Sequence, residues 1–222
     1  MPCCLYLNYI LSVNHVRDLG VIIDESLKFN LQVQSIVSKA YQRLGILFRG
    51  FTSRDPVLLT RAYTTFVRPV LEYCSVVWSP YLLKDLDAIE GVQRYFTRRI
   101  YSHRSFTYHE RLRLLGLESL EVRRLRFDLI MCFKIIHNMV DLDKHSFFKF
   151  SNDSRTRGHS LKLVKPFNKN VQFDHFFCNR VVDCWNSLPI ELVTCETLSK
   201  FKGCIKKVNL DKFLKGRALV TL

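Results

Sequence analysis

Two pairs of closely spaced carboxylates are the first residues that could do chemistry. Asp85 and Asp87, and likewise Asp141 and Asp143, stand two positions apart. Paired carboxylates can hold the metal ions that catalyse nucleotidyl transfer. However, the first pair falls in the first turn of a predicted helix, where acidic side chains stabilise the helix dipole, and the second falls at a helix-to-loop junction. We therefore predict no metal ion at either pair.

Cysteine and histidine could form a zinc site or a nucleophilic site. The eight cysteines stand at positions 3, 4, 74, 132, 178, 184, 195 and 204, so that no two are separated by two residues. His175 and Cys178 have no second pair at zinc-finger distance. The seven histidines fall in different predicted elements, and no serine or cysteine stands in a recognisable nucleophile turn. We expect free thiols, with no metal, no cofactor and no catalytic residue.

Positive charge is the strongest chemical signal. The chain carries 34 Lys and Arg against 20 Asp and Glu, which gives a net charge of +14. Such an excess favours a polyanionic partner such as nucleic acid, although composition alone does not distinguish it from an acidic membrane surface. Arginine predominates over residues 84–134 and lysine over residues 135–222. Arginine can make forked contacts with phosphate, whereas lysine acts as a mobile point charge.

The candidate contacts with nucleic acid are basic side chains from these two segments. They are Arg94, Arg98, Arg99, Arg104, Arg123, Arg124, Arg126, Lys202, Lys206 and Lys207. The alternative is a plain solvated surface, since Glu90 could pair with Arg94 and Glu121 with Arg124 at helical spacing. The lysines from 200 to 215, with Arg217, face only Glu196 and Asp211 nearby, so we expect this tail to act as a purely electrostatic patch.

The elements that must position these residues are mainly α-helical. Hydrophobic residues make up 48% of the chain, and only eight Gly and six Pro occur, which favours long helices over many short strands. Segments 4–10 and 16–23 are predicted strands of a hairpin, joined by a turn at 12–14, and Gly20 within the second marks a bulge or a close approach of the backbone. We expect these two strands to be the edge of a sheet whose remainder is missing.

Apolar periodicity and capping signals predict the helices. They cover residues 30–50 with Asn30 as the cap, 55–78 with a bend or break at Pro69, 84–100, 108–115, 118–139, 172–187 and 197–207. A strand is predicted at 161–165. We expect Trp78 and Trp185 to be core anchors.

The polar segment 151–160 is the predicted linker, so three parts follow. These are a β-hairpin over 1–27, a helical domain over 28–150 and a small α/β C-terminal extension with a basic tail over 151–222. No apolar run is long enough to span a membrane, and the N-terminus lacks the features of a signal peptide. We expect an intracellular protein, cytoplasmic or nuclear.

Six blocks of sequence occur in a characteristic order. They are DLGVIID (18–24), VRPVLEYCSVVWSP (67–80), IEGVQRYFTRRI (89–100), ERLRLLGLESLEVRRLR (110–126), RVVDCWNSLP (180–189) and FK (201–202). Over residues 15–206 this series resembles the segment downstream of the polymerase palm in non-LTR retrotransposon reverse transcriptases of the jockey-like kind. The resemblance implies the last palm hairpin, a helical thumb and a C-terminal extension.

The resemblance also implies what is absent. The family's catalytic metal ions are held by a Tyr/Phe-x-Asp-Asp turn and an upstream Asp of the palm, and this chain has no such motif. It also lacks an endonuclease domain and the C-x2-C-x4-H-x4-C knuckle of some relatives. The implied function is a non-catalytic fragment that binds template–primer nucleic acid, RNA or an RNA–DNA hybrid, through its backbone, with the palm of a parent polymerase as a further partner. The alternative is an inert or protein-binding helical module from a degraded element copy.

Overall fold

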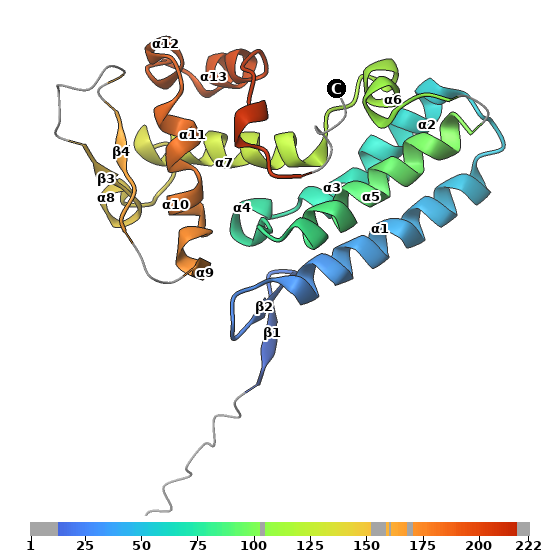
Figure 1. Ribbon diagram of the computed structural model, residues 1–222, viewed down its shortest axis with the longest axis horizontal. Coiled ribbons are helices and arrows are strands. Elements are labelled where there is room, and N and C mark those ends of the chain that lie inside the picture. Colours follow the sequence, from blue (N-terminus) through green and yellow to red (C-terminus); the bar gives the residue numbers. More distant parts are fainter. Residues whose placement is uncertain (1–12, 103–104, 152–158, 160, 168–170, 217–222) are drawn as a thin grey trace, which may run out of the picture.

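The computed structural model describes residues 13–102, 105–151, 159, 161–167 and 171–216. As predicted, the chain is mainly helical with small antiparallel sheets (Figure 1). The longer helices are α1 (Asn30–Gly50), α2 (Pro56–Ala62), α5 (Leu83–Ile100), α6 (Tyr108–Leu115), α7 (Leu120–Ile136) and α13 (Leu198–Ile205). The shorter ones are α3 (Arg68–Glu72), α4 (Ser75–Trp78), α8 (Lys144–Phe147), α9 (Val171–Asp174), α10 (Phe177–Arg180), α11 (Val182–Asn186) and α12 (Ile190–Val193), with a π-helix η1 (Tyr63–Val67) and a 3-10 helix η2 (Asp211–Phe213).

The N-terminal hairpin spans the segment 16–23, which we expected to be a single strand. Strand β1 (His15–Asp18) pairs antiparallel with β2 (Val21–Asp24). Leu19 and Gly20 both have positive φ, 43° and 89°, as a two-residue type I′ turn requires. Gly20 is thus a turn residue and not a bulge, and the prediction of one strand over 16–23 was wrong. The predicted strand at 4–10 lies outside the described residues.

Helix α1 has the predicted bounds but not the predicted cap. Phe29 precedes it in a left-handed conformation, with φ of 57°. Asp24 fixes this turn, because its carboxylate accepts hydrogen bonds from the backbone N–H groups of Ser26 and Phe29. The following helix begins as predicted, with Asp55 accepting a hydrogen bond from the N–H of Leu58 at 2.8 Å.

Pro69 interrupts the second helical segment, which confirms that prediction. Helix α2 widens into η1, restarts as α3 with Pro69 in its first turn, and ends before α4. Proline lacks the N–H that a regular helix would use there, so the turn before it cannot close in the usual way. The predicted helix over 172–187 was wrong in a similar respect: Phe176 is extended, with ψ of 153°, and the segment forms α9, α10 and α11.

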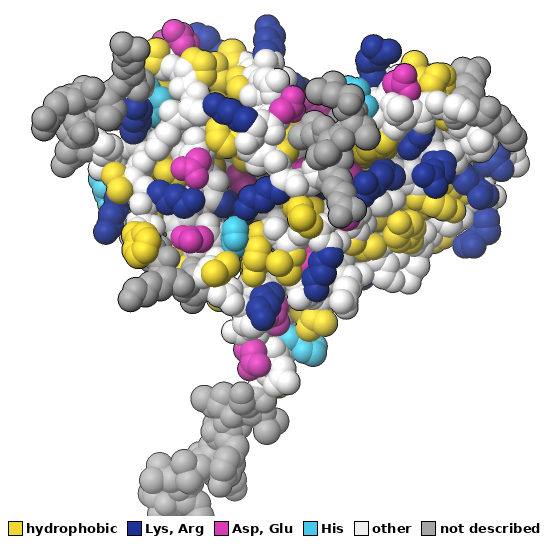
Figure 2. Space-filling model, in the orientation of Figure 1, with side chains coloured by type: hydrophobic (Ala, Val, Ile, Leu, Met, Phe, Trp, Pro, Cys, Tyr) yellow, Lys and Arg dark blue, Asp and Glu magenta, His cyan; other side chains and the backbone are white. Residues whose placement is uncertain are grey.

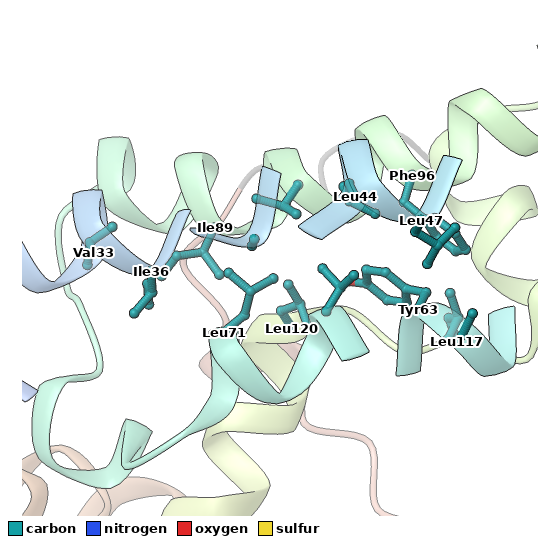
Figure 3. Packing of buried hydrophobic residues seen from close by; sticks show 14 of the residues in the cluster. Val33, Ile36, Leu44, Leu47, Tyr63, Leu71, Ile89, Phe96, Leu117 and Leu120 are labelled. Carbon is teal, nitrogen blue, oxygen red and sulfur yellow. The ribbon is translucent and has the colours of Figure 1, made fainter. Parts of the chain in front are cut away.

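Buried side chains form two hydrophobic clusters. The first runs from Val21 to Leu120 and the second from Leu129 to Leu210, so α7 contributes to both. Figure 3 shows the first cluster, in which the rings of Tyr63 and Phe96 stack with their centroids 4.2 Å apart. Trp78 lies in the first cluster and Trp185 in the second, each with 0% exposure, which confirms both as core anchors.

The division between the clusters does not coincide with the boundary predicted at residue 151. Strand β3 (Lys149–Phe150) precedes that point and pairs with β4 (Leu163–Val164), which follows it. The second half of α7, from Leu129, also packs with the C-terminal part. Within the described ranges, none of the helices is both long and apolar enough to cross a bilayer.

Candidate nucleic-acid interface

Helices α1 and α5 run side by side in the same direction (Figure 1). Near their middle, the rings of Tyr41 and Tyr95 lie 5.7 Å apart. At their C-terminal end, the guanidinium of Arg99 lies 5.6 Å from the centroid of the Phe48 ring. Residues near the ends of the two helices are therefore brought together.

Four exposed arginines lie at this end, and we call them the basic end: Arg49, Arg54, Arg98 and Arg99. Figure 2 shows Lys and Arg side chains gathered over the right-hand edge of the molecule, where α1 and α5 end in Figure 1. Cations here also suit the carbonyl ends of both helices. Arg49 and Arg54 are not among the contacts predicted from the sequence, because the parallel packing of α1 on α5 is a tertiary feature.

Arg111 adds a further positive charge next to the basic end. Its Nε donates a hydrogen bond to the hydroxyl of Thr97 at 3.2 Å. Burial, followed by the charge of Arg98, lowers the pKa of Arg111. Cations are thus crowded where α5 ends and α6 begins, and an incoming anion would relieve their repulsion.

Three of the predicted contact residues make ion pairs instead of facing solvent freely. Arg94 pairs at 3.1 Å with Asp87, and not with Glu90 as the spacing suggested. Arg123 makes a two-point contact with Glu72 of α3, and Arg126 pairs with Glu118 while donating to the carbonyl of Lys206. Because the partners of Arg123 and Arg126 are distant in the sequence or outside helical spacing, the local pattern did not reveal them.

Arg124 was expected at the surface but has only 1% exposure. The expected pair with Glu121 does not form, since that carboxylate accepts hydrogen bonds from the backbone N–H groups of Lys215 at 2.7 Å and Gly216 at 3.0 Å. A guanidinium enclosed in this way cannot reach the phosphates of a duplex lying on the surface. Arg124 is therefore removed from the candidate interface.

The lysine residues occupy a different part of the molecule. Lys202, Lys206 and Lys207 are exposed on α13 and the turn after it. Helix α13 packs on α7 in the second cluster, well apart from the basic end (Figure 1). Arg104 and Arg217 lie outside the described residues.

Two of the four paired carboxylates, Asp87 and Asp143, have structural contacts. Asp87 pairs with Arg94, Asp85 lies buried in the first turn of α5, and Asp143 caps α8 by accepting from the N–H groups of His145 and Ser146. In the part of the chain that the structure describes, no group of three His, Cys, Asp or Glu residues could hold a metal ion. The described cysteines are free thiols, and burial raises the pKa of Cys184 to about 12, so that this thiol is protonated at neutral pH.

Comparisons with known proteins give one distant relative. An uncharacterized protein of Caenorhabditis elegans is 23% identical over 135 residues, which is 60% of this chain and 66% of that protein. The match thus spans just under two thirds of the relative's length. No protein-family description and no solved structure matches the chain.

Proposed function

We propose that this chain is a non-catalytic fragment of a retrotransposon RNA-directed DNA polymerase, and that it binds template–primer nucleic acid through the phosphate backbone. The observation that carries the proposal is the basic end, where Arg49 of α1, Arg98 and Arg99 of α5, and Arg54 of the segment that follows α1 lie together. The order of the six sequence blocks supports the thumb assignment. A net charge of +14 supports a polyanionic partner inside the cell, in the cytoplasm or the nucleus.

The side chains of the basic end suit backbone contacts better than base readout. Exposed arginines can fork onto phosphate oxygens without reading a base edge. Such contacts depend little on sequence and fall steeply with salt, because each neutralised phosphate releases counterions. Since the packed pair α1 and α5 fixes the spacing of Arg49, Arg98 and Arg99, these three arginines approach a duplex as a set.

The test compares two double variants that change the charge equally. R98E/R99E removes two arginines of the basic end, both on α5, and K39E/K84E removes two exposed lysines, one from α1 and one from α5. Lys84 precedes Arg98 by about 21 Å along α5, at 1.5 Å per residue. Binding of a fluorescent RNA–DNA hybrid is measured by anisotropy over a fourfold range of salt.

We expect R98E/R99E to weaken binding and to flatten the logarithmic salt slope by about one for each lost contact. K39E/K84E should leave the slope unchanged. Equal losses in both variants would reduce the interaction to non-specific attraction and contradict the assignment. Circular dichroism controls for folding, and a primed RNA template with Mg²⁺ should support no synthesis of DNA.

An exposed apolar surface favours a second candidate function, that of a protein-binding module. Leu19 is 83% exposed at the tip of the hairpin, next to the exposed Val16. The hydroxyl of Tyr73, itself 54% exposed, donates to the carbonyl of Leu19 at 2.9 Å, so the hairpin and the α3–α4 turn form one surface. A palm or another protein could dock there. If this candidate is right, L19D/Y73D abolishes capture of that partner while hybrid binding persists.

A further inference from the structure

A pocket of about 430 Å³ lies where the two clusters meet, within the size range of small-molecule sites. One wall comes from α7, another from the Ser79–Tyr81 turn and the N-terminal half of α5. The remaining walls come from α9 to α11 and from residues 212–215. The pocket is separate from the basic end, and the side chains that line it are distinct from those of the proposed nucleic-acid interface.

Arg124 lines this pocket with an unsatisfied guanidinium. Among the described residues, neither Nε nor Nη1 nor Nη2 has a hydrogen-bond partner, although the side chain is 1% exposed. Leaving buried donors unpaired costs about 1–3 kcal/mol each, and more for a charged group. Arg124 lines the pocket while its guanidinium is buried and has no partner, so acceptor oxygens that reached it would be bound favourably.

The neighbouring carboxylates offset the charge of Arg124 but do not accept its hydrogen bonds. Glu90 accepts from the N–H of Leu120 and from the hydroxyl of Tyr108. Asp128 is engaged by Arg180, with two contacts of 2.8 Å. Glu121 is engaged by the backbone of Lys215 and Gly216. The guanidinium thus lacks acceptors even though carboxylates surround it.

Further cations lie around the same pocket. Lys212 and Lys215 line it and are exposed, so their ammonium groups can swing toward a bound anion. Lys165 also lines it but pairs at 3.2 Å with Asp183. The carboxylate of Asp174 faces the pocket as well and opposes an anion, so the lining favours a ligand of low charge.

We propose that this pocket binds a small oxyanion, a phosphate or a carboxylate group, whose oxygens accept hydrogen bonds from Arg124 and whose charge is met by Lys212 and Lys215. The planar fork of a guanidinium matches both groups. Because the nitrogens of Arg124 are covered, the anion reaches them when side chains of the wall shift. The segment 212–215 forms one wall of the pocket and is joined to α7 through Glu121, which accepts hydrogen bonds from the N–H groups of Lys215 and Gly216.

The experiment titrates the full-length chain with inorganic phosphate, with acetate and with chloride at equal ionic strength. Thermal unfolding and calorimetry measure binding. We expect a saturable rise in the unfolding temperature with phosphate, acetate or both, and none with chloride. A response to phosphate alone identifies a phosphate group as the ligand, and a response to acetate alone identifies a carboxylate. If neither anion stabilises the chain more than chloride does, the proposal is overturned.

Variants locate the binding. Arg124→Gln should abolish it, and K212A/K215A should raise the dissociation constant about tenfold, with folding verified by circular dichroism. The matched control K39A/K149A, two exposed lysines outside the pocket, should bind as the parent does. Because K212A/K215A alters only exposed side chains, it decides the question even if Arg124→Gln fails to fold. Equal binding by K212A/K215A and the parent overturns the site. R98E/R99E should retain anion binding, so this proposal and the proposed function can fail separately.

Discussion

At the scale of single residues, a buried ion pair links two parts of the chain. Asp128 and Arg180 form a two-point ion pair between α7 and α10, and Arg180 also donates to the carbonyl of Val76 at 2.6 Å. This one guanidinium therefore connects the second cluster to helix α4. Burial raises the pKa of Asp128, and Arg180 opposes that rise.

Replacing Arg180 with Met should destabilise the fold by about 3–5 kcal/mol, because it leaves the buried Asp128 carboxylate without its partner. The pKa of Asp128 should then rise further above that of the unfolded chain. When the pKa of a carboxyl group is higher in the folded than in the unfolded protein, the free energy of unfolding falls as the pH rises toward the folded pKa. The loss of stability in R180M relative to the parent should therefore grow between pH 4 and pH 7. Urea unfolding at several pH values measures this.

The matched control is Lys165→Met, which removes the exposed pair with Asp183 and should cost less than about 1 kcal/mol. A deficit in R180M that is equally small and independent of pH would show that the buried pair does not hold the two parts together.

The residues also show why part of the candidate site could not be predicted from the sequence. Exposed Arg98 and Arg99 follow from the periodicity of α5 alone. By contrast, Arg124 was predicted as a surface contact because of its charge, although it follows the buried Leu120 by four residues and so lies near the same face of α7. Leu120 belongs to the first cluster and Leu129 to the second, so this face is covered and Arg124 is buried with it. How completely the face is covered depends on long-range packing.

At the scale of elements, local signals predicted the boundaries that they control. Asp55-Pro56 starts α2 and Pro69 interrupts it, since both act through the backbone of their own turn. The hairpin was misassigned because Leu19-Gly20 is not the usual Asn-Gly or Asp-Gly of a type I′ turn. The two positive φ values arise because β1 and β2 pair with each other across this turn. The β-branched residues that follow Gly20 indicate a strand but do not show where the turn before it lies.

Replacing glycine with alanine should have opposite effects on stability at two positions, Gly20 in the hairpin turn and Gly45 in α1. Gly20→Ala should destabilise the hairpin by about 1 kcal/mol, because a φ of 89° strains any residue with a Cβ atom. Gly45→Ala, in the interior of α1, should stabilise the protein by roughly 0.5–1 kcal/mol, because a Cβ atom there would make only an ordinary contact of 3.8 Å with the side chain of Arg49. Urea unfolding and amide hydrogen exchange of β1 and β2 measure both effects. Unchanged exchange of β1 and β2 in Gly20→Ala would contradict the turn assignment.

At the scale of the whole molecule, α7 joins two clusters that each contain one tryptophan. Trp78 reports on the first cluster and Trp185 on the second, and the chain has no other tryptophan. A continuous helix shared by both, together with the contact from Arg180 to Val76, should make the clusters unfold as one unit. The alternative is a separate C-terminal unit beginning near residue 151.

Single-tryptophan variants decide between these arrangements. In W185F, fluorescence follows Trp78 alone, and Phe201→Ala is then added in the second cluster, where Phe201 stacks on Phe133 of α7 with ring centroids 4.2 Å apart. Truncating a buried Phe costs about 3–5 kcal/mol. If the clusters are coupled, the urea midpoint seen by Trp78 falls by the amount that this cost predicts, although the mutation lies in the other cluster.

The converse pair, W78F with Ile89→Ala in the first cluster, should lower the midpoint seen by Trp185 in the same way. An unchanged midpoint at the distant tryptophan in either pair would show two independent units, and α7 would then fold with only one of them.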